Sequence, residues 1–75
     1  MILNKIKSVH FIGIGGIGMS SLAFYLRTNG VKVTGSDIND SKITRKLKRN
    51  GCMVNLEHKA DNIQNQDLII YSSAI

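Results

Sequence analysis

The chain has 75 residues, of which 43% are hydrophobic and 20% charged, and its formal net charge is +5 at pH 7. This length allows one domain at most, and the composition is typical of a globular domain with an aliphatic core. The single cysteine, Cys52, excludes an internal disulfide and a cysteine-based zinc site, and no apolar run approaches the ~18 residues of a membrane span.

The first residues predict a strand followed by a helix. Residues 9–14, "VHFIGI", form a compact apolar run that is typical of a buried strand. From Ile17 the apolar residues recur at helical spacing, and residues 19–29 contain no proline or glycine. Gly30 follows at the position where helices commonly end, because glycine adopts a left-handed conformation at little cost.

A second strand is predicted over residues 31–36, and Asp37 stands at its end. The segment that follows is turn-like, and either Asp40 or Ser41 can cap a second helix. That helix is predicted to end at Asn50 and Gly51, which repeat the glycine signature of a helix C-terminus.

The second helix carries much of the positive charge of the chain. Ile43 and Leu47 lie four residues apart and predict a buried stripe. No aromatic residue interleaves with the charges, as stacking on a single-stranded nucleic acid would require. We therefore interpret the basic residues as a solvated helix face and expect no nucleic-acid partner. They are Lys42, Arg45, Lys46, Lys48 and Arg49.

The last third of the chain predicts two more strands. Residues 52–55 form a short strand, residues 56–66 are polar with at most one helical turn near Ile63, and residues 67–73 form a strong strand. Strands that alternate with helices pair in parallel through crossover connections. We therefore expect an α/β fold, a Rossmann-like three-layer half-domain with a parallel four-stranded sheet in the order 3-2-1-4.

Four glycines lie around the junction of the first strand and the first helix. Gly13, Gly15 and Gly18 match the spacing G-x-G-x-x-G, and Gly16 is an extra glycine. In dinucleotide-binding folds the first glycine makes a tight turn, the second lets a pyrophosphate approach the backbone, and the third allows close packing of helix and strand. The helix N-terminus then offers unpaired N–H groups and a positive dipole end to the phosphates.

Asp37 narrows the expected ligand. It lies 19 residues after Gly18, at a strand end, where the acid of dinucleotide folds binds ribose hydroxyls. A carboxylate repels a 2′-phosphate, and no arginine follows Asp37 directly, so an NADP site is disfavoured. The alternative is a ligand-free turn in which Asp37 only caps the next helix.

Four stretches together resemble one family in their order and spacing. They are "HFIGIGGIGMSSLA", "GVKVTGSDI", "EHKADNI" and "LIIYSSAI", and they cover nearly the whole chain from Val9 to Ile75. They resemble the N-terminal domain of the Mur ligases, most closely of those members that join L-alanine to UDP-N-acetylmuramic acid. The resemblance implies that residues 1–75 form the N-terminal Rossmann-like nucleotide-sugar-binding domain of a peptidoglycan-precursor ligase.

The resemblance also implies the site. The diphosphate of UDP-N-acetylmuramic acid would rest on the loop from Gly15 through Ser20, and Asp37 would face the uridine ribose. His58 is either a ligand contact or a surface residue, and Ser72 and Ser73 either reach the ligand or cap the next element. The expected substrate-binding residues are Gly13, Gly15, Gly16, Ile17, Gly18, Met19, Ser20, Asp37, His58, Ser72 and Ser73.

The resemblance implies chemistry that this chain is not expected to perform alone. In the family, ATP phosphorylates the muramoyl carboxylate, the amine of L-alanine attacks the acyl phosphate, and magnesium bridges phosphates. Holding ATP requires a P-loop, yet the 75 residues contain no Gly-Lys dipeptide. We expect ATP and magnesium to bind the central and C-terminal domains of the parent enzyme, which are absent here. This chain should contain no catalytic residue, cofactor or metal.

Two other functions stay open from the residues alone. One is an NAD-binding half-domain of a dehydrogenase, and the other is a non-catalytic nucleotide-sensing module. His10, at the start of the first strand, is interpreted as structural, because strand starts are half-buried. The N-terminal segment has no long apolar region before its first lysine, so we expect no secretory signal, no membrane partner and a cytoplasmic location.

Overall fold

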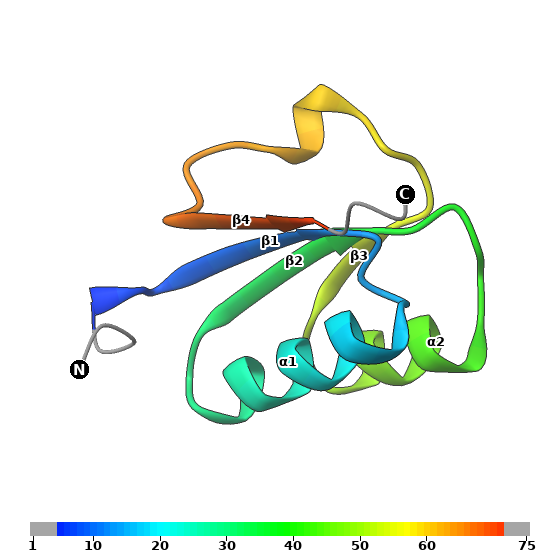
Figure 1. The fold of residues 1–75 in the computed structure, drawn as a ribbon, viewed down its shortest axis with the longest axis horizontal. Helices are drawn as coiled ribbons and strands as arrows, with labels where there is room; N and C mark the ends of the chain where they lie inside the picture. The colour runs from blue at the N-terminus through cyan, green and yellow to red at the C-terminus, as the bar shows by residue number, and fades with distance from the viewer. Residues whose placement is uncertain (1–4, 72–75) are drawn as a thin grey trace.

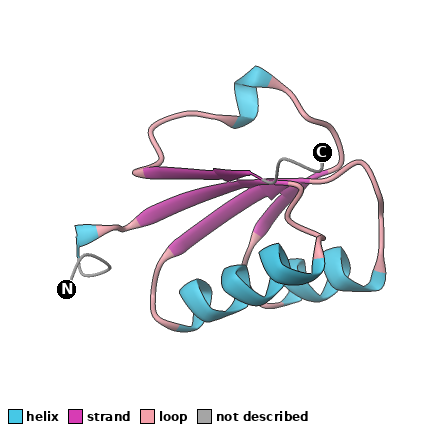
Figure 2. Ribbon diagram, in the orientation of Figure 1, coloured by secondary structure: helices cyan, strands magenta, loops and turns pink. Residues whose placement is uncertain are grey.

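The structure is a computed structural model of the chain and describes residues 5–71. Its elements follow the predicted order, and Figure 2 distinguishes the strands, helices and loops. They are β1 (Ser8–Ile12), α1 (Ile17–Thr28), β2 (Lys32–Ser36), α2 (Lys42–Arg49), β3 (Met53–Asn55), the 3-10 helix η2 (Ala60–Asn62) and β4 (Leu68–Tyr71). Within the described residues, no helix is long and apolar enough to cross a membrane.

The four strands form one parallel sheet in the order β3-β2-β1-β4, which confirms the predicted topology. β1 lies between β2 and β4, and its residues Val9, His10 and Phe11 are all buried. A strand in this position is covered on both faces of the sheet, so its sequence is apolar apart from Ser8 at its start and His10.

The two faces of the sheet are covered differently. Figure 1 shows α1 and α2 on one face and the connection from β3 to β4, with η2, over the other. The chain moves from β1 through β2 to β3 in one direction and then returns past β1 to β4. Because crossovers keep one hand, this reversal places the last connection on the opposite face. The third of the predicted layers is therefore an irregular connection rather than a full helix.

The apolar core lies between the sheet and the two helices. Helix α2 contributes Leu47, which is fully buried, and Ile43, which is half-buried, as the predicted stripe requires. Thr44 is also buried, and a capping box with Ser41 at the start of α2 satisfies its hydroxyl. The five basic residues of α2 are exposed. The core residues are Val9, Phe11, Ile14, Ala23, Leu26, Val31, Val33, Leu47 and Cys52.

Polar side chains attach the β3–β4 connection to the other face of the sheet. Nδ1 of His10 lies 2.7 Å from Oγ1 of Thr34, and Gln66 donates to the same oxygen at 3.3 Å. His10 is only 1% exposed, as its structural interpretation requires. Burial lowers the pKa of His10, and the nearby imidazole of His58 lowers that pKa further. His10 is therefore uncharged at neutral pH.

The end of β1 differs from the prediction. The strand stops at Ile12, and Gly13 turns the chain with a φ of 84°, where a side chain would be strained. Ile14 then leaves the strand direction and is fully buried. A Cβ placed on Gly35 would lie 2.6 Å from Cδ1 of Ile14. Gly35 is therefore required because Ile14 packs directly on the backbone of β2.

Replacing Gly35 with alanine should destabilise the chain by about 1–3 kcal/mol, the usual cost of overpacking a core. Gly18→Ala is the matched control, because a Cβ at Gly18 meets nothing within 4 Å. Chemical denaturation of both variants measures the difference in the free energy of unfolding. Equal stabilities for the two variants would contradict the packing of Ile14 against β2.

The neutral state of His10 should make stability depend on pH. The unfolded chain protonates this imidazole near its ordinary pKa of about 6.5, whereas the folded state lowers the pKa. The unfolded state therefore binds more protons, and stability should fall as the pH drops below that value. In His10→Asn, which cannot titrate there, the melting temperature should change less between about pH 7.5 and pH 5. An identical pH dependence in both proteins would argue against a buried neutral His10.

Candidate functional site

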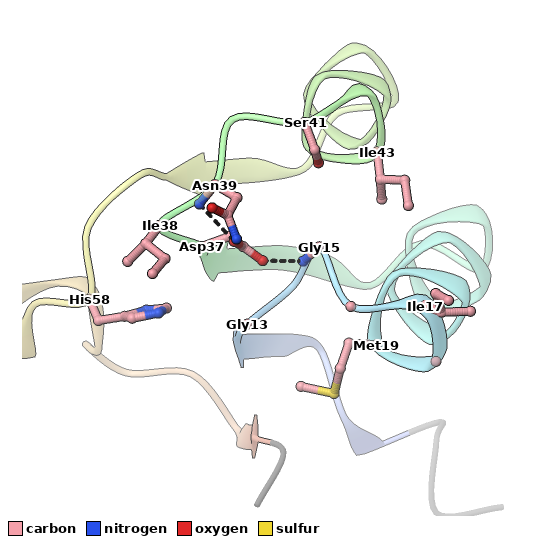
Figure 3. A pocket seen from close by; sticks show the side chains of 12 residues that line it. Gly13, Gly15, Ile17, Met19, Asp37, Ile38, Asn39, Ser41, Ile43 and His58 are labelled. Carbon is pink, nitrogen blue, oxygen red and sulfur yellow. Dashed lines mark hydrogen bonds between the residues drawn. The ribbon is translucent and has the colours of Figure 1, made fainter. Parts of the chain in front are cut away.

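A cavity of about 870 Å³ opens at the carboxyl ends of the strands. Its walls are the β1–α1 loop with the first turn of α1, the β2–α2 loop with the start of α2, and His58 from the β3–β4 connection (Figure 3). This is the edge at which open α/β sheets bind their ligands. The lining residues are Gly13, Gly15, Gly16, Ile17, Gly18, Met19, Asp37, Ile38, Asn39, Ser41, Ile43 and His58.

The glycine loop is tied to the end of β2 by its own backbone. The amides of Gly13 and Ile14 both donate to the carbonyl oxygen of Ser36, at 2.8 and 3.0 Å. The amide of Gly16 donates to the carbonyl of Gly13 at 3.1 Å. These bonds satisfy the loop amides that point toward the protein and fix where the following helix starts.

Asp37 fixes the middle of the loop. Its Oδ2 accepts from the amide of Gly15 at 2.8 Å, and its Oδ1 accepts from the amide of Asn39 at 2.9 Å; Figure 3 draws both bonds. A Cβ on Gly15 would lie 2.6 Å from Oδ2 of Asp37. Gly15, the second glycine of the motif, is therefore needed so that this carboxylate can approach the loop. From the sequence, this need was predicted only for the approach of a ligand.

The third glycine has a different role from the one predicted. We expected Gly18 to allow close packing of α1 against a strand, but a Cβ at Gly18 meets nothing within 4 Å. The prediction was wrong because α1 already begins at Ile17, and Gly18 faces the cavity from the first turn. A glycine here leaves the space beside the helix N-terminus empty.

The N-terminus of α1 has neither a side-chain cap nor an acidic residue beside its positive dipole end. Within residues 5–71, no acceptor is recorded for the amides of Ile17, Gly18 and Met19, and the first turn contains no acidic residue. The cap residue is Gly16, which has no side chain to accept from them. Helix α2 shows the opposite arrangement, because Ser41 caps it. Three unpaired amides and the positive end of the α1 dipole therefore face the cavity.

Apolar side chains form the rim of the cavity. Ile17 is 84% exposed and Ile38 is 68% exposed, and both line the opening. Met19 and Ile43 line it as well. Four lining residues were not predicted from the sequence: Ile38, Asn39, Ser41 and Ile43. The position of the β2–α2 loop at the same sheet edge as the glycines was a signal for them.

His58 reaches the cavity from the opposite face of the sheet. Its Nδ1 lies 2.6 Å from Oγ of Ser36, which is 1% exposed, whereas the ring itself is exposed. Figure 3 shows the imidazole projecting toward Gly13. The structure thus brings His58 together with the glycine loop and Asp37.

Not all predicted residues meet in the cavity. Ser20 is buried, its hydroxyl donates to the carbonyl of Ile17 at 3.0 Å, and it does not line the cavity. Ser72 and Ser73 lie outside the described residues. Among residues 5–71, leaving aside the side chain of Asp61, no group of three or more His, Cys, Asp or Glu side chains could hold a metal ion. Cys52 is buried in the core, and this burial raises the pKa of its thiol.

Comparison with known proteins gives consistent relatives. The sequence model described as Mur ligase family, catalytic domain, matches residues 8–75. The chain is 55% identical over 69 residues to a UDP-N-acetylmuramate–L-alanine ligase of Campylobacter jejuni, covering 92% of this chain and 16% of that protein. It is 51% identical over 74 residues to the ligase of the same name from Clostridium botulinum, covering 99% of this chain and 16% of that one.

One solved structure is also similar to this chain. The chain is similar to a murein peptide ligase from Psychrobacter arcticus, with a TM-score of 0.85 and 31% identity over 92% of this chain and 15% of that one. The chain thus spans about one sixth of the length of these relatives.

Asp37→Ala should release the amide of Gly15, because this amide loses a hydrogen bond to a charged acceptor. Its hydrogen exchange, measured by NMR, should speed up by about tenfold or more. Asp37→Asn is the matched control: it keeps one acceptor oxygen and should preserve part of the protection. Unchanged exchange at Gly15 in Asp37→Ala would contradict the role of this carboxylate in holding the loop.

Proposed function

This chain belongs to the Mur ligase family, and we propose that it is the N-terminal domain that binds the UDP part of UDP-N-acetylmuramic acid. The observation that carries the proposal is the uncapped N-terminus of α1. The amides of its first turn face a cavity of about 870 Å³, and that turn contains no acidic residue. Such an end binds anionic oxygens, and a diphosphate supplies several of them.

Asp37 supports a ribose beside the diphosphate. Each of its carboxylate oxygens accepts one backbone amide, from Gly15 and from Asn39. A carboxylate oxygen has two lone pairs, so both oxygens keep an accepting position for a ribose hydroxyl. The same charge repels a 2′-phosphate, which favours a nucleotide such as UDP over NADP.

The apolar rim supports a base at the far end of the nucleotide. Ile38 follows Asp37 directly and is largely exposed, and Ile43 lines the same wall. A pyrimidine bound there would cover apolar surface that is otherwise in water, and burial of such surface stabilises a complex by about 25 cal/mol per Å² before the costs of binding.

The reaction of the parent enzyme follows from this assignment. We propose an ATP-dependent ligation in which the muramoyl carboxylate is phosphorylated and the amine of L-alanine displaces the phosphate to form an amide. The remaining domains of the ligase would hold ATP and magnesium and supply the reacting groups, and residues 5–71 would anchor the nucleotide end of the substrate. ATP and the nucleotide sugar are cytoplasmic metabolites, which supports a cytoplasmic location for this step of peptidoglycan precursor synthesis.

A charge reversal at Gly18 tests the anion site. Gly18→Asp adds a carboxylate to the first turn of α1, where it favours the helix but repels phosphate. Gly18→Asn has nearly the same shape without the charge. We expect UDP to bind the unmodified chain and Gly18→Asn with similar affinity, and Gly18→Asp at least about tenfold more weakly, without loss of thermal stability.

Titration of UDP and of NADH against all three proteins by NMR decides between ligand classes. Binding of UDP but not NADH supports the proposal. Binding of NADH without a response to UDP would favour the dehydrogenase alternative, and equal affinity of the Asp and Asn variants for UDP would refute the α1 anion site.

A further inference from the structure

We propose that Ser36 and His58 form a positioning pair that keeps a proton on Nε2 of His58 and presents it to an anionic oxygen of the bound nucleotide. This inference rests on the proposed nucleotide binding and adds a donor to that site from the opposite face of the sheet. His58 would contact the ligand, and Ser36 would act only through His58.

Ser36 is held rigidly at the end of β2. It is 1% exposed, and its carbonyl oxygen accepts the amides of Gly13 and Ile14. Its side-chain oxygen lies 2.6 Å from Nδ1 of His58, the one side-chain partner recorded for this hydroxyl among residues 5–71. The hydroxyl therefore has a fixed position from which it can orient the imidazole.

The proton of the Ser36 hydroxyl decides the tautomer of His58. A buried donor without an acceptor is costly, so the hydroxyl donates to Nδ1 when the imidazole is neutral. A neutral imidazole that accepts at Nδ1 carries its own proton on Nε2. If the ring is protonated, Nδ1 donates to the hydroxyl and Nε2 still carries a proton. Nε2 is consequently a donor in both states.

The geometry places this donor in the same cavity as the start of α1. His58 lines the same cavity as Gly13, Gly15 and Gly18, and its ring is exposed there. Figure 3 shows the imidazole entering the cavity from the side opposite α1. Between the first turn of α1 and His58, an anionic ligand would meet N–H donors on two sides. A hydrogen bond to a charged group is about twice as strong as a neutral one, so such a donor contributes to affinity.

Two amide substitutions separate the two nitrogens of the ring. In His58→Gln the side-chain amide nitrogen reaches approximately the position of Nε2, whereas in His58→Asn it reaches approximately that of Nδ1. We expect His58→Gln to bind UDP nearly as well as the unmodified chain and His58→Asn to bind it about tenfold more weakly. His58 is exposed, but His58→Gln takes away the partner of the buried Ser36 hydroxyl, so the thermal stability of both variants is measured alongside their affinity for UDP.

The role of Ser36 is tested by spectroscopy. Two-dimensional ¹H–¹⁵N NMR of the imidazole distinguishes the two neutral tautomers in the ligand-free protein. We expect the Nε2–H form in the unmodified chain and a mixture of forms in Ser36→Ala, with UDP bound a few-fold more weakly. Ser36→Cys, which keeps a weak donor, should restore part of the Nε2–H population.

The outcomes separate this inference from the proposed function. If UDP binds and His58→Asn binds it as tightly as His58→Gln does, the donor role of His58 is wrong while the proposed function stands. If the unmodified chain holds the Nδ1–H tautomer, the positioning role of Ser36 is wrong. If UDP does not bind the unmodified chain at all, the proposed function fails, and the tautomer measurement still decides the pairing of Ser36 with His58.

Discussion

The carboxyl end of β2 holds the site together through three backbone amides. Two of them, from Gly13 and Ile14, converge on the carbonyl of Ser36, and the third, from Gly15, reaches the carboxylate of Asp37. Buried amides must find acceptors, and these three find them on the neighbouring strand rather than in the loop itself. The loop is thereby held against β2. After the amide of Gly16, which bonds the carbonyl of Gly13, the amides of Ile17, Gly18 and Met19 are left without an acceptor at the start of α1. The proposed anion site consists of the first-turn amides of α1 that this arrangement leaves without an acceptor.

The two helices differ in how their N-termini are stabilised. Helix α2 has a complete capping box and basic residues in its last turn, both of which favour a helix that needs no ligand. Helix α1 has a glycine cap and no acid in its first turn. Replacing a good cap with glycine costs a helix only a few tenths of a kcal/mol, so the fold tolerates this end. The cavity therefore lies at the N-terminus of α1, which has neither a side-chain cap nor a first-turn acid to stabilise it.

Much of the fold could be predicted because its signals are local. The apolar run of β1, the helical spacing after Ile17 and the glycines at helix ends each depend on a few neighbouring residues, and all were found in place. The roles of single site residues were harder to predict, because they depend on partners far apart in sequence. Gly15 meets Asp37, and Ser36 meets His58, each across 22 residues. Spacing indicated an acid near the glycines, but only the folded backbone reveals that the acid bonds the loop itself.

The contacts of the cavity join residues that are far apart in the sequence, so they can form only as the chain emerges. A chain that is still being synthesised can form α1 locally, but β1 and the loop amides lack their hydrogen-bond partners until β2 has emerged. The imidazole arrives later still, with the β3–β4 connection. Parallel strands joined by crossovers form slowly, because distant segments must meet before any bond repays their ordering. A nascent chain therefore contains its glycine motif well before the loop amides and the Ser36 hydroxyl have met their partners.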